Sequence, residues 1–180
     1  MPRNITPDDK KFEELILHFA SRCEEDPTYS ATKLNKLLFF ADFFAYASLG
    51  EPITGHRYQK LPNGPAPVAL LPVVSRMEQR GDCEWEERPY FGRTQRRLTA
   101  KRGADLSWIS DEQQSLVDDL VDQLWGVSAT EVSELSHEYP GWQAMGMKEV
   151  IPYETIFVLP ARPLTAGEIE HARELASSRS

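Results

Sequence analysis

Cysteine is scarce in this sequence, which has only Cys23 and Cys83 among 180 residues. Two cysteines are too few for a disulfide framework in a chain of this length. No pair of cysteines or histidines has the spacing of a zinc-binding motif. We therefore expect two free thiols in a reducing compartment, no bound metal and no cofactor.

Long apolar runs are also absent. The most apolar segment extends from Leu37 to Leu49, and Asp42 interrupts it. A helix needs about 20 apolar residues to cross a bilayer, so this segment is too short. The N-terminus is polar and charged, unlike a secretory signal peptide. These features predict a cytoplasmic protein that makes no contact with a membrane.

Positive charge is missing from a long internal stretch, because no Lys or Arg occurs from Gly103 to Met147. The acids in this stretch are Asp105, Asp111, Glu112, Asp118, Asp119, Asp122, Glu131, Glu134 and Glu138. Any one of them is best explained by a solvated helix face. Together they predict an acidic surface that attracts basic partners, such as proteins that handle nucleic acid. The net charge of −8 itself argues against a protein that coats nucleic-acid phosphates.

The sequence does have the composition of a globular protein, with 41% hydrophobic and 27% charged residues. Its length suits one domain, so we expect residues 1–180 to form a single domain. Apolar spacing predicts a mainly α fold with a small antiparallel β-sheet, an α+β protein. We expect helices at about 7–25, 30–49, 67–80, 111–125, 129–138 and 166–177, a strand at 53–61, a stiff loop at 62–67, a β-hairpin at 82–101 and an extended segment at 150–159.

Capping residues set several helix boundaries. Thr6 and Pro7 suit the cap and first position of the first helix. Three further helix starts match the capping-box pattern, namely Ser110 with Gln113, Ser128 with Glu131, and Thr165 with Glu168. The second half of the chain is therefore predicted to be mostly helical.

The helix at about 30–49 is apolar on most sides, which is typical of a helix at the centre of a fold. Asp42 lies among its phenylalanines, and a buried carboxylate must be paired, hydrogen-bonded or neutral. We favour a structural pairing of Asp42 with Arg57, Tyr58 or Lys36. The alternative is an acid with a raised pKa in a functional pocket.

Catalytic groups are hard to assemble from this sequence. His137 lies at a predicted helix C-terminus, where a cation is favourable without any function, and no nucleophile or metal pairs with it. His18 and His171 are expected to be solvated. No Gly-rich phosphate loop occurs. We therefore predict that the protein is not an enzyme, with a small hydrolase that uses Asp42 or His137 as an alternative.

Two strings resemble a known family. The first, KLNKLLFFADFFAYASLGEPITGHRYQKLPNGPAPVAL, is similar to the opening of the Panacea domain of SocA-like antitoxins. The matching residues are Lys33, Leu34, Lys36, Leu37, Leu38, Gly50, Tyr58, Gly64 and Pro65. The second, SATEVSELSHEYPGWQ, matches at Leu135, Ser136, His137 and Trp142. The loop QKLPNGPAP is longer than in many relatives, and His56 replaces an aromatic residue.

This resemblance spans about residues 32–157 and implies a mainly helical fold with a small antiparallel sheet. It also implies a bacterial or phage antitoxin that neutralises a toxin encoded next to it. The candidate partner-binding residues are Tyr58, Asn63, Gly64, Pro65, Asp111, Asp118, Asp119, Asp122 and Trp142. Lys36, Asp42 and His137 are expected to be structural or to line a pocket.

Alternatives stay open at this point. Trp142 and the other tryptophans can be plain core residues, and Tyr58 with Gly64 and Pro65 can be scaffold. The basic hairpin arm at 88–102 can serve a DNA-binding regulator, although the net charge disfavours DNA as a partner. The chain can also form a homo-oligomer.

Overall fold

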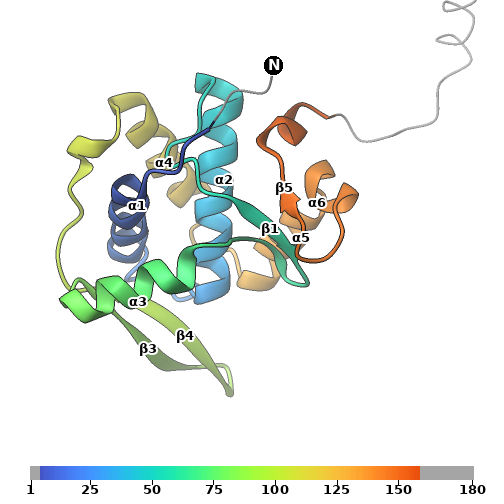
Figure 1. Cartoon of the computed structure of the whole chain (residues 1–180). Helices are drawn as coiled ribbons and strands as arrows, with labels where there is room; N and C mark the ends of the chain where they lie inside the picture. Colours follow the sequence, from blue (N-terminus) through green and yellow to red (C-terminus); the bar gives the residue numbers. More distant parts are fainter. Residues whose placement is uncertain (1–4, 159–180) are drawn as a thin grey trace, which may run out of the picture.

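The computed structural model describes residues 5–158 (Figure 1). In chain order the elements are α1 (Asp9–Arg22), α2 (Ala31–Leu49), β1 (Tyr58–Leu61), β2 (Gly64–Pro67), α3 (Leu70–Arg80), β3 (Cys83–Tyr90), β4 (Arg93–Ala100), the 3₁₀ turn η1 (Leu106–Trp108), α4 (Asp111–Leu124), α5 (Ala129–His137), α6 (Pro140–Ala144), β5 (Val150–Ile151) and the 3₁₀ turn η2 (Tyr153–Phe157). Helices with two small antiparallel sheets confirm the predicted α+β class. The helix predicted at 166–177 lies outside the described residues.

Helix α2 is at the centre of the molecule, as its apolar sequence predicts (Figure 1). It packs against α1, α4 and α5, the edge strand β2 and the turn η2. Its Leu37, Phe39 and Phe43 are fully buried. Burying a side chain of this size stabilises the fold by roughly 1.5–3 kcal/mol. Ser30 caps the start of α2 by accepting from Lys33 N. No helix within residues 5–158 is long and apolar enough to cross a bilayer.

The three-stranded sheet has the order β2-β1-β5 and is antiparallel throughout. We predicted a stiff loop at 62–67, and this was wrong from Gly64 onward, because 64–67 pairs with β1. Pro65 and Pro67 have no N–H to donate, which disfavours a strand. Strand β2 lies at the edge of the sheet, where a proline can sit without breaking a ladder. The loop therefore shrinks to the two residues between β1 and β2.

The β-hairpin predicted at 82–101 is confirmed as β3 and β4, which pair along their whole length. In Figure 1 it extends from the bottom of the molecule, below α3. Its turn consists of Phe91 and Gly92, and the Phe91 side chain is 91% exposed. The base of the hairpin is covered by α1 and α3. The tip is therefore the part of the hairpin that is available to other molecules.

Two boundaries differ from the prediction for local reasons. Helix α1 begins at Asp9, because Asp8 is the cap and accepts from Lys11 N at 3.0 Å. Asp8 N also donates to Thr54 O at 2.8 Å, which keeps the residues before the helix on the loop after α2. The segment predicted to be extended at 150–159 is a strand only at 150–151. It then turns into the 3₁₀ turn η2 after Pro152.

Candidate partner-binding surface

Asp42 is fully buried on α2 and is held by donors from other segments. Thr54 donates from N at 2.6 Å and from Oγ1 at 2.5 Å, and Tyr58 OH donates at 2.7 Å. Burial raises the pKa of Asp42, although these hydrogen bonds act in the opposite direction. Tyr153 OH donates to His56 O at 2.5 Å beside this group. Of the partners proposed for Asp42, the structure has Tyr58, and the carboxylate ties α2 to the loop before β1.

This tie explains why the strand predicted at 53–61 begins only at Tyr58. Thr54 is bound to Asp42 through its backbone and its side chain, so it cannot pair with a neighbouring strand. The segment 53–56 is buried instead, and Ile5 and Thr6 lie close to Gly55. The carboxylate of Asp42 is therefore an organising group for the fold, reached by no opening in residues 5–158.

Lys36 is also buried, where α2 passes the β1–β2 turn and α5. Its Nζ donates to Pro65 O at 2.9 Å, and burial lowers the pKa of Lys36 to about 7. Gly64 has φ +96°, and a Cβ added there would lie 2.6 Å from Lys36 Cε and even closer to Ser136 Oγ. The turn, α2 and α5 are therefore locked together at a position that only glycine fits.

These contacts change the list of candidate surface residues. Tyr58, Gly64 and Pro65 are buried, so the prediction that they lie at the surface is wrong. Tyr58 has its hydroxyl on Asp42, and the other two lie under α5 and α2. Asn63 is exposed at the tip of the turn. Of the four residues predicted from this loop and strand, only Asn63 can contact a partner in this conformation.

Trp142 lies half-buried between two side chains. The His137 ring stacks on it with a centroid distance of 4.1 Å and an interplanar angle of 21°. Lys60 Nζ lies 4.2 Å from the Trp142 ring centroid, and Trp142 Nε1 donates to Leu61 O at 3.2 Å. The indole therefore joins α6 to the α5 terminus and to β1, and its outer part stays open to solvent. No hydrogen bond or ion pair joins His137 to Asp42 in the described residues.

The acids predicted on α4 divide between two faces. Asp118 and Asp122 point toward α1, where Asp118 Oδ1 lies 3.1 Å from His18 Nε2 and Asp122 Oδ1 lies 3.4 Å from Arg22 Nη2. Asp119 is exposed and has no ion pair in residues 5–158, and the same is true of Asp111. The acidic face that remains available is therefore the one turned away from α1.

The expectation that His18 is solvated was wrong. His18 is 8% exposed, and its Nε2 lies 3.1 Å from Asp118 Oδ1 of α4. Burial lowers the pKa of His18, while the neighbouring Asp118 acts to raise it. A contact between residues 100 positions apart leaves no signal in the helical spacing of α1.

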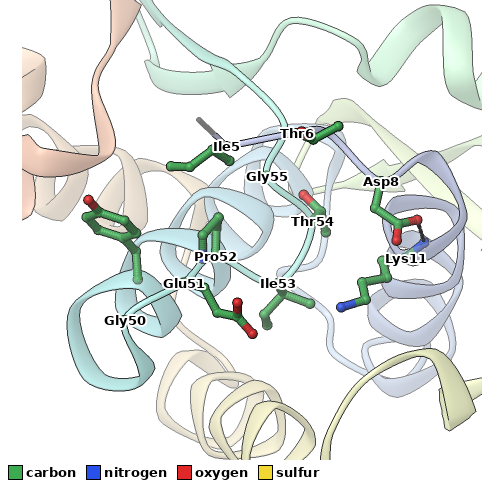
Figure 2. A pocket seen from close by; sticks show the side chains of 11 residues that line it. Ile5, Thr6, Asp8, Lys11, Gly50, Glu51, Pro52, Ile53, Thr54 and Gly55 are labelled. Atoms are coloured by element: carbon green, nitrogen blue, oxygen red, sulfur yellow. Dashed lines mark hydrogen bonds between the residues drawn. The ribbon is translucent and has the colours of Figure 1, made fainter. Parts of the chain in front are cut away.

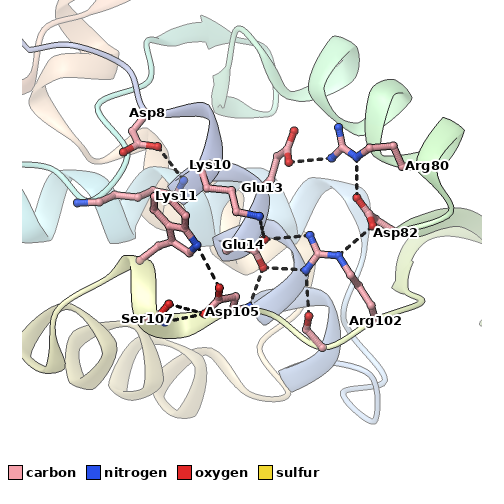
Figure 3. A network of polar contacts seen from close by, with 12 residues as sticks. Asp8, Lys10, Lys11, Glu13, Glu14, Arg80, Asp82, Arg102, Asp105 and Ser107 are labelled. Atoms are coloured by element: carbon pink, nitrogen blue, oxygen red, sulfur yellow. Dashed lines mark hydrogen bonds and ion pairs between the residues drawn. The ribbon is translucent and has the colours of Figure 1, made fainter.

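In the basic hairpin arm proposed to bind DNA, most Lys and Arg side chains already have partners within the protein. Arg102 donates to both Glu14 oxygens at 2.9 Å and to Asp82 Oδ1 at 2.9 Å, in a network that also contains Arg80 and Glu13 (Figure 3). Arg97 is buried and donates to the carbonyls at the end of α1, those of Cys23 and Glu24. Arg88 and Lys101 pair with acids of β3.

Two basic residues of the arm, Arg93 and Arg96, have neither a carboxylate nor a carbonyl partner in residues 5–158, and Arg96 stacks over the Trp85 ring at 4.2 Å. Phosphate neutralisation by several Lys or Arg supplies most of the affinity of proteins for DNA. Most of the positive charge counted in this arm is therefore paired, either with acids of the hairpin itself or with α1 and the residues that follow it.

A pocket of about 330 Å³ lies between the residues around the start of α1 and the loop after α2. Figure 2 shows the side chains that line it. Its charged lining groups are Asp8, Lys11 and Glu51. Asp8 already caps α1, and Thr54 at the pocket wall is bound to Asp42. The described residues that line the pocket include no pairing of a nucleophile with a base.

Neither the cysteines nor the other side chains that can bind metals form a reactive site in residues 5–158. Burial raises the pKa of Cys23 to about 12 and that of Cys83 to about 11, so both are protonated thiols at neutral pH. Within residues 5–158, no three His, Cys, Asp or Glu side chains are grouped so that they could hold a metal ion.

Sequence reasoning missed the pairing of Lys33 with Asp26. Both side chains are buried, with Lys33 Nζ 2.6 Å from Asp26 Oδ2. Lys33 Nζ also donates to Leu124 O at 2.5 Å and to Val127 O at 2.9 Å. This buried lysine thus joins the α1–α2 loop to the end of α4. The signal in the sequence was a lysine in a mostly apolar helix, which also contains Lys36 and Asp42.

The comparisons with known proteins give one result. A family model described as "Antitoxin SocA-like, Panacea domain" matches residues 34–143. No curated protein and no solved structure matches. The matched range contains most of α2, both strands of the hairpin, α4, α5 and Trp142.

Proposed function

Because this chain belongs to the SocA-like antitoxin family with the Panacea domain, we propose that it is an antitoxin that neutralises a toxin protein by direct binding. The family match is the observation that carries this proposal. We further propose that it acts in the cytoplasm, as a single domain with a Panacea-like core at about 32–157, on a toxin encoded beside it. In this role it is a binding protein and not an enzyme.

The charge distribution supports binding as the mechanism. A surface with uncompensated acids speeds the docking of a basic partner by electrostatic steering. Asp111 and Asp119 are exposed carboxylates of α4 with no cation beside them in residues 5–158. Asn63 and the open edge of Trp142 are further surface groups of the matched region. Asp42 and Lys36 are buried and hold α2 to the segments around β1, so they are not part of this surface.

Co-expression tests the proposal. The neighbouring gene is induced alone and together with this chain in a bacterial host, and growth is followed. We expect the neighbouring product to stop growth when alone and to be harmless with this chain. The two products should also elute together in size-exclusion chromatography. A neighbour that is harmless by itself, or toxicity that this chain does not relieve, refutes the proposal.

A further inference from the structure

A groove runs between α2 and α4 on the side of α4 that faces away from α1. It begins as a hollow of about 550 Å³ between the C-terminal half of α2 and the N-terminal half of α4. A second hollow, of about 360 Å³, continues it toward the end of α4 and the start of α6. The two hollows share Phe44, Leu120 and Gln123, so they form one continuous groove.

The walls of this groove contain exposed apolar side chains. Phe44 is 39% exposed, Leu49 is 41% exposed, and Leu135, in α5, is 50% exposed. Phe44 stacks on Phe40 at a centroid distance of 5.3 Å, which gives the groove an aromatic floor. Helix α2 is apolar on nearly all sides, but its neighbours cover only part of it. The uncovered part is a surface that an apolar partner can bury.

The rim of the groove carries charge of one sign. Glu112, Asp119 and Glu138 line it, and none of them forms an ion pair in residues 5–158. No Lys or Arg of the described chain lines either hollow. The rim therefore repels anionic membranes and nucleic acid. A second copy that used the same groove would place these acids against each other, because such a dimer interface is self-complementary.

We propose that this groove docks a short amphipathic helix of the toxin, with an apolar face on Phe44 and Leu135 and with Lys or Arg along its flanks. The proposal rests on the proposed function and identifies the surface that performs it. The groove follows α2 from Phe40 to Leu49, which is about 14 Å at 1.5 Å per residue. A helix of two to three turns fits this length, with anchors spaced at three and four residues.

The test uses a probe of defined chemistry and the full chain. The probe is a labelled amphipathic peptide of about 14 residues, which is long enough for a helix to form in a groove. It contains leucine at spacings of three and four, with lysine elsewhere. Fluorescence anisotropy measures its dissociation constant at low and high salt. A peptide of the same composition in scrambled order, and one with glutamate in place of lysine, are the matched probes.

Three variants change the groove. Phe44→Ser and Leu135→Ser remove exposed apolar side chains, and Asp119→Lys reverses one rim charge. Matched controls lie outside the groove: Leu71→Ser removes a leucine that is 64% exposed on α3, and Glu25→Lys reverses an exposed acid before α2. Circular dichroism checks that every variant is folded.

We expect the wild-type chain to bind the amphipathic lysine peptide and to bind both matched peptides at least tenfold more weakly. Each groove variant should weaken binding by about tenfold, and each control by less than twofold. The effect of Asp119→Lys should shrink at high salt, because exposed charges are screened, while that of Phe44→Ser persists. Equal binding of the scrambled peptide, or equal effects of groove and control variants, overturns the proposal.

Two further outcomes separate this proposal from the proposed function. If the wild-type chain and the double variant Phe44→Ser/Asp119→Lys neutralise the neighbouring toxin equally well, the antitoxin role stands and the proposal that the groove binds the toxin is wrong. If the wild-type chain fails to neutralise it, the antitoxin role is wrong, and the peptide titration still decides what the groove binds. A wild-type dimer that Phe44→Ser converts to a monomer assigns the groove to a second copy and also overturns the proposal.

Discussion

The substitution Gly64→Ala tests how closely the β1–β2 turn packs against α2 and α5. A Cβ at this position would lie 2.6 Å from Lys36 Cε and closer still to Ser136 Oγ. The residue also has φ +96°, a conformation that L-residues with a side chain rarely adopt. The new methyl group therefore meets two separate penalties, one from the backbone and one from packing.

The magnitude follows from adding these penalties. A left-handed backbone costs an alanine roughly 1–2 kcal/mol relative to glycine. Forcing a methyl group into a packed site costs about 1–3 kcal/mol. We expect Gly64→Ala to lower the free energy of unfolding by about 2–5 kcal/mol, which is a large part of the total for a domain of this size.

Urea denaturation followed by circular dichroism measures this loss as a lower midpoint. Gly92→Ala is the matched control, because Gly92 has φ +74° and no described atom lies within 4 Å of the position that an alanine Cβ would take there. It isolates the backbone penalty, so it should cost no more than about 2 kcal/mol. Adding Ser136→Ala to Gly64→Ala should recover part of the packing loss. If Gly64→Ala costs no more than Gly92→Ala, the close approach of α2, α5 and the turn is refuted.

Three further predictions concern buried charges. Lys33→Met should lower the free energy of unfolding by about 3–5 kcal/mol, because it leaves Asp26 buried and unpaired. Adding Asp26→Asn should recover part of this loss. A melting temperature of Lys33→Met equal to that of the wild type would contradict the pairing. Arg102 and Lys10 overcome the effect of burial and lower the pKa of Glu14 from 4.5 to about 2. The Glu14 carboxylate therefore stabilises the fold above pH 4.5, and about 2 kcal/mol of this stabilisation should be lost by pH 3. The urea midpoint of Glu14→Gln should therefore fall less than that of the wild type when the pH is lowered to 3. Burial lowers the pKa of Lys36 from 10.5 to about 7, so above pH 7 the unfolded chain binds more protons than the folded one. The free energy of unfolding should therefore rise from pH 7 to pH 8.5, and Lys36→Met should remove this rise. An equal slope of stability against pH in the variant would show that Lys36 is not buried as described.

Several predictions that depend on local sequence succeeded, although the cap of α1 is Asp8 and not Thr6. The capping boxes at Ser110 and Ser128 both form, so the starts of α4 and α5 are where the sequence predicts them. The apolar run of α2 predicts the central helix for the same reason, because a helix that is apolar on most sides can be recognised without knowledge of its neighbours. The hairpin at 82–101 follows from alternation and a short turn.

Predictions that depend on distant partners failed. His18 was expected to be a solvated residue of α1, but it is buried and contacts Asp118, which is 100 positions away in the chain. Gly64 and Pro65 have the composition of an exposed loop, but Lys36 binds the Pro65 carbonyl and β1 pairs with the segment. Contacts across 29 or 100 residues cannot be derived from a local pattern. The acids of α4 divide between two faces for the same reason.

The residues that carry the family resemblance have mostly structural roles in this chain. Lys33 holds Asp26 and the end of α4, and Lys36 holds the Pro65 carbonyl, so both lysines of the KLNKLL string are buried supports. A motif made of such residues identifies the fold and does not identify the partner. Leu135 is an exception, because it belongs to the resemblance and is half exposed on the groove wall. If the proposed groove selects the partner, substituting Leu135 should weaken partner binding without lowering the melting temperature, while substituting Lys33 should lower the melting temperature and weaken binding only through the loss of stability.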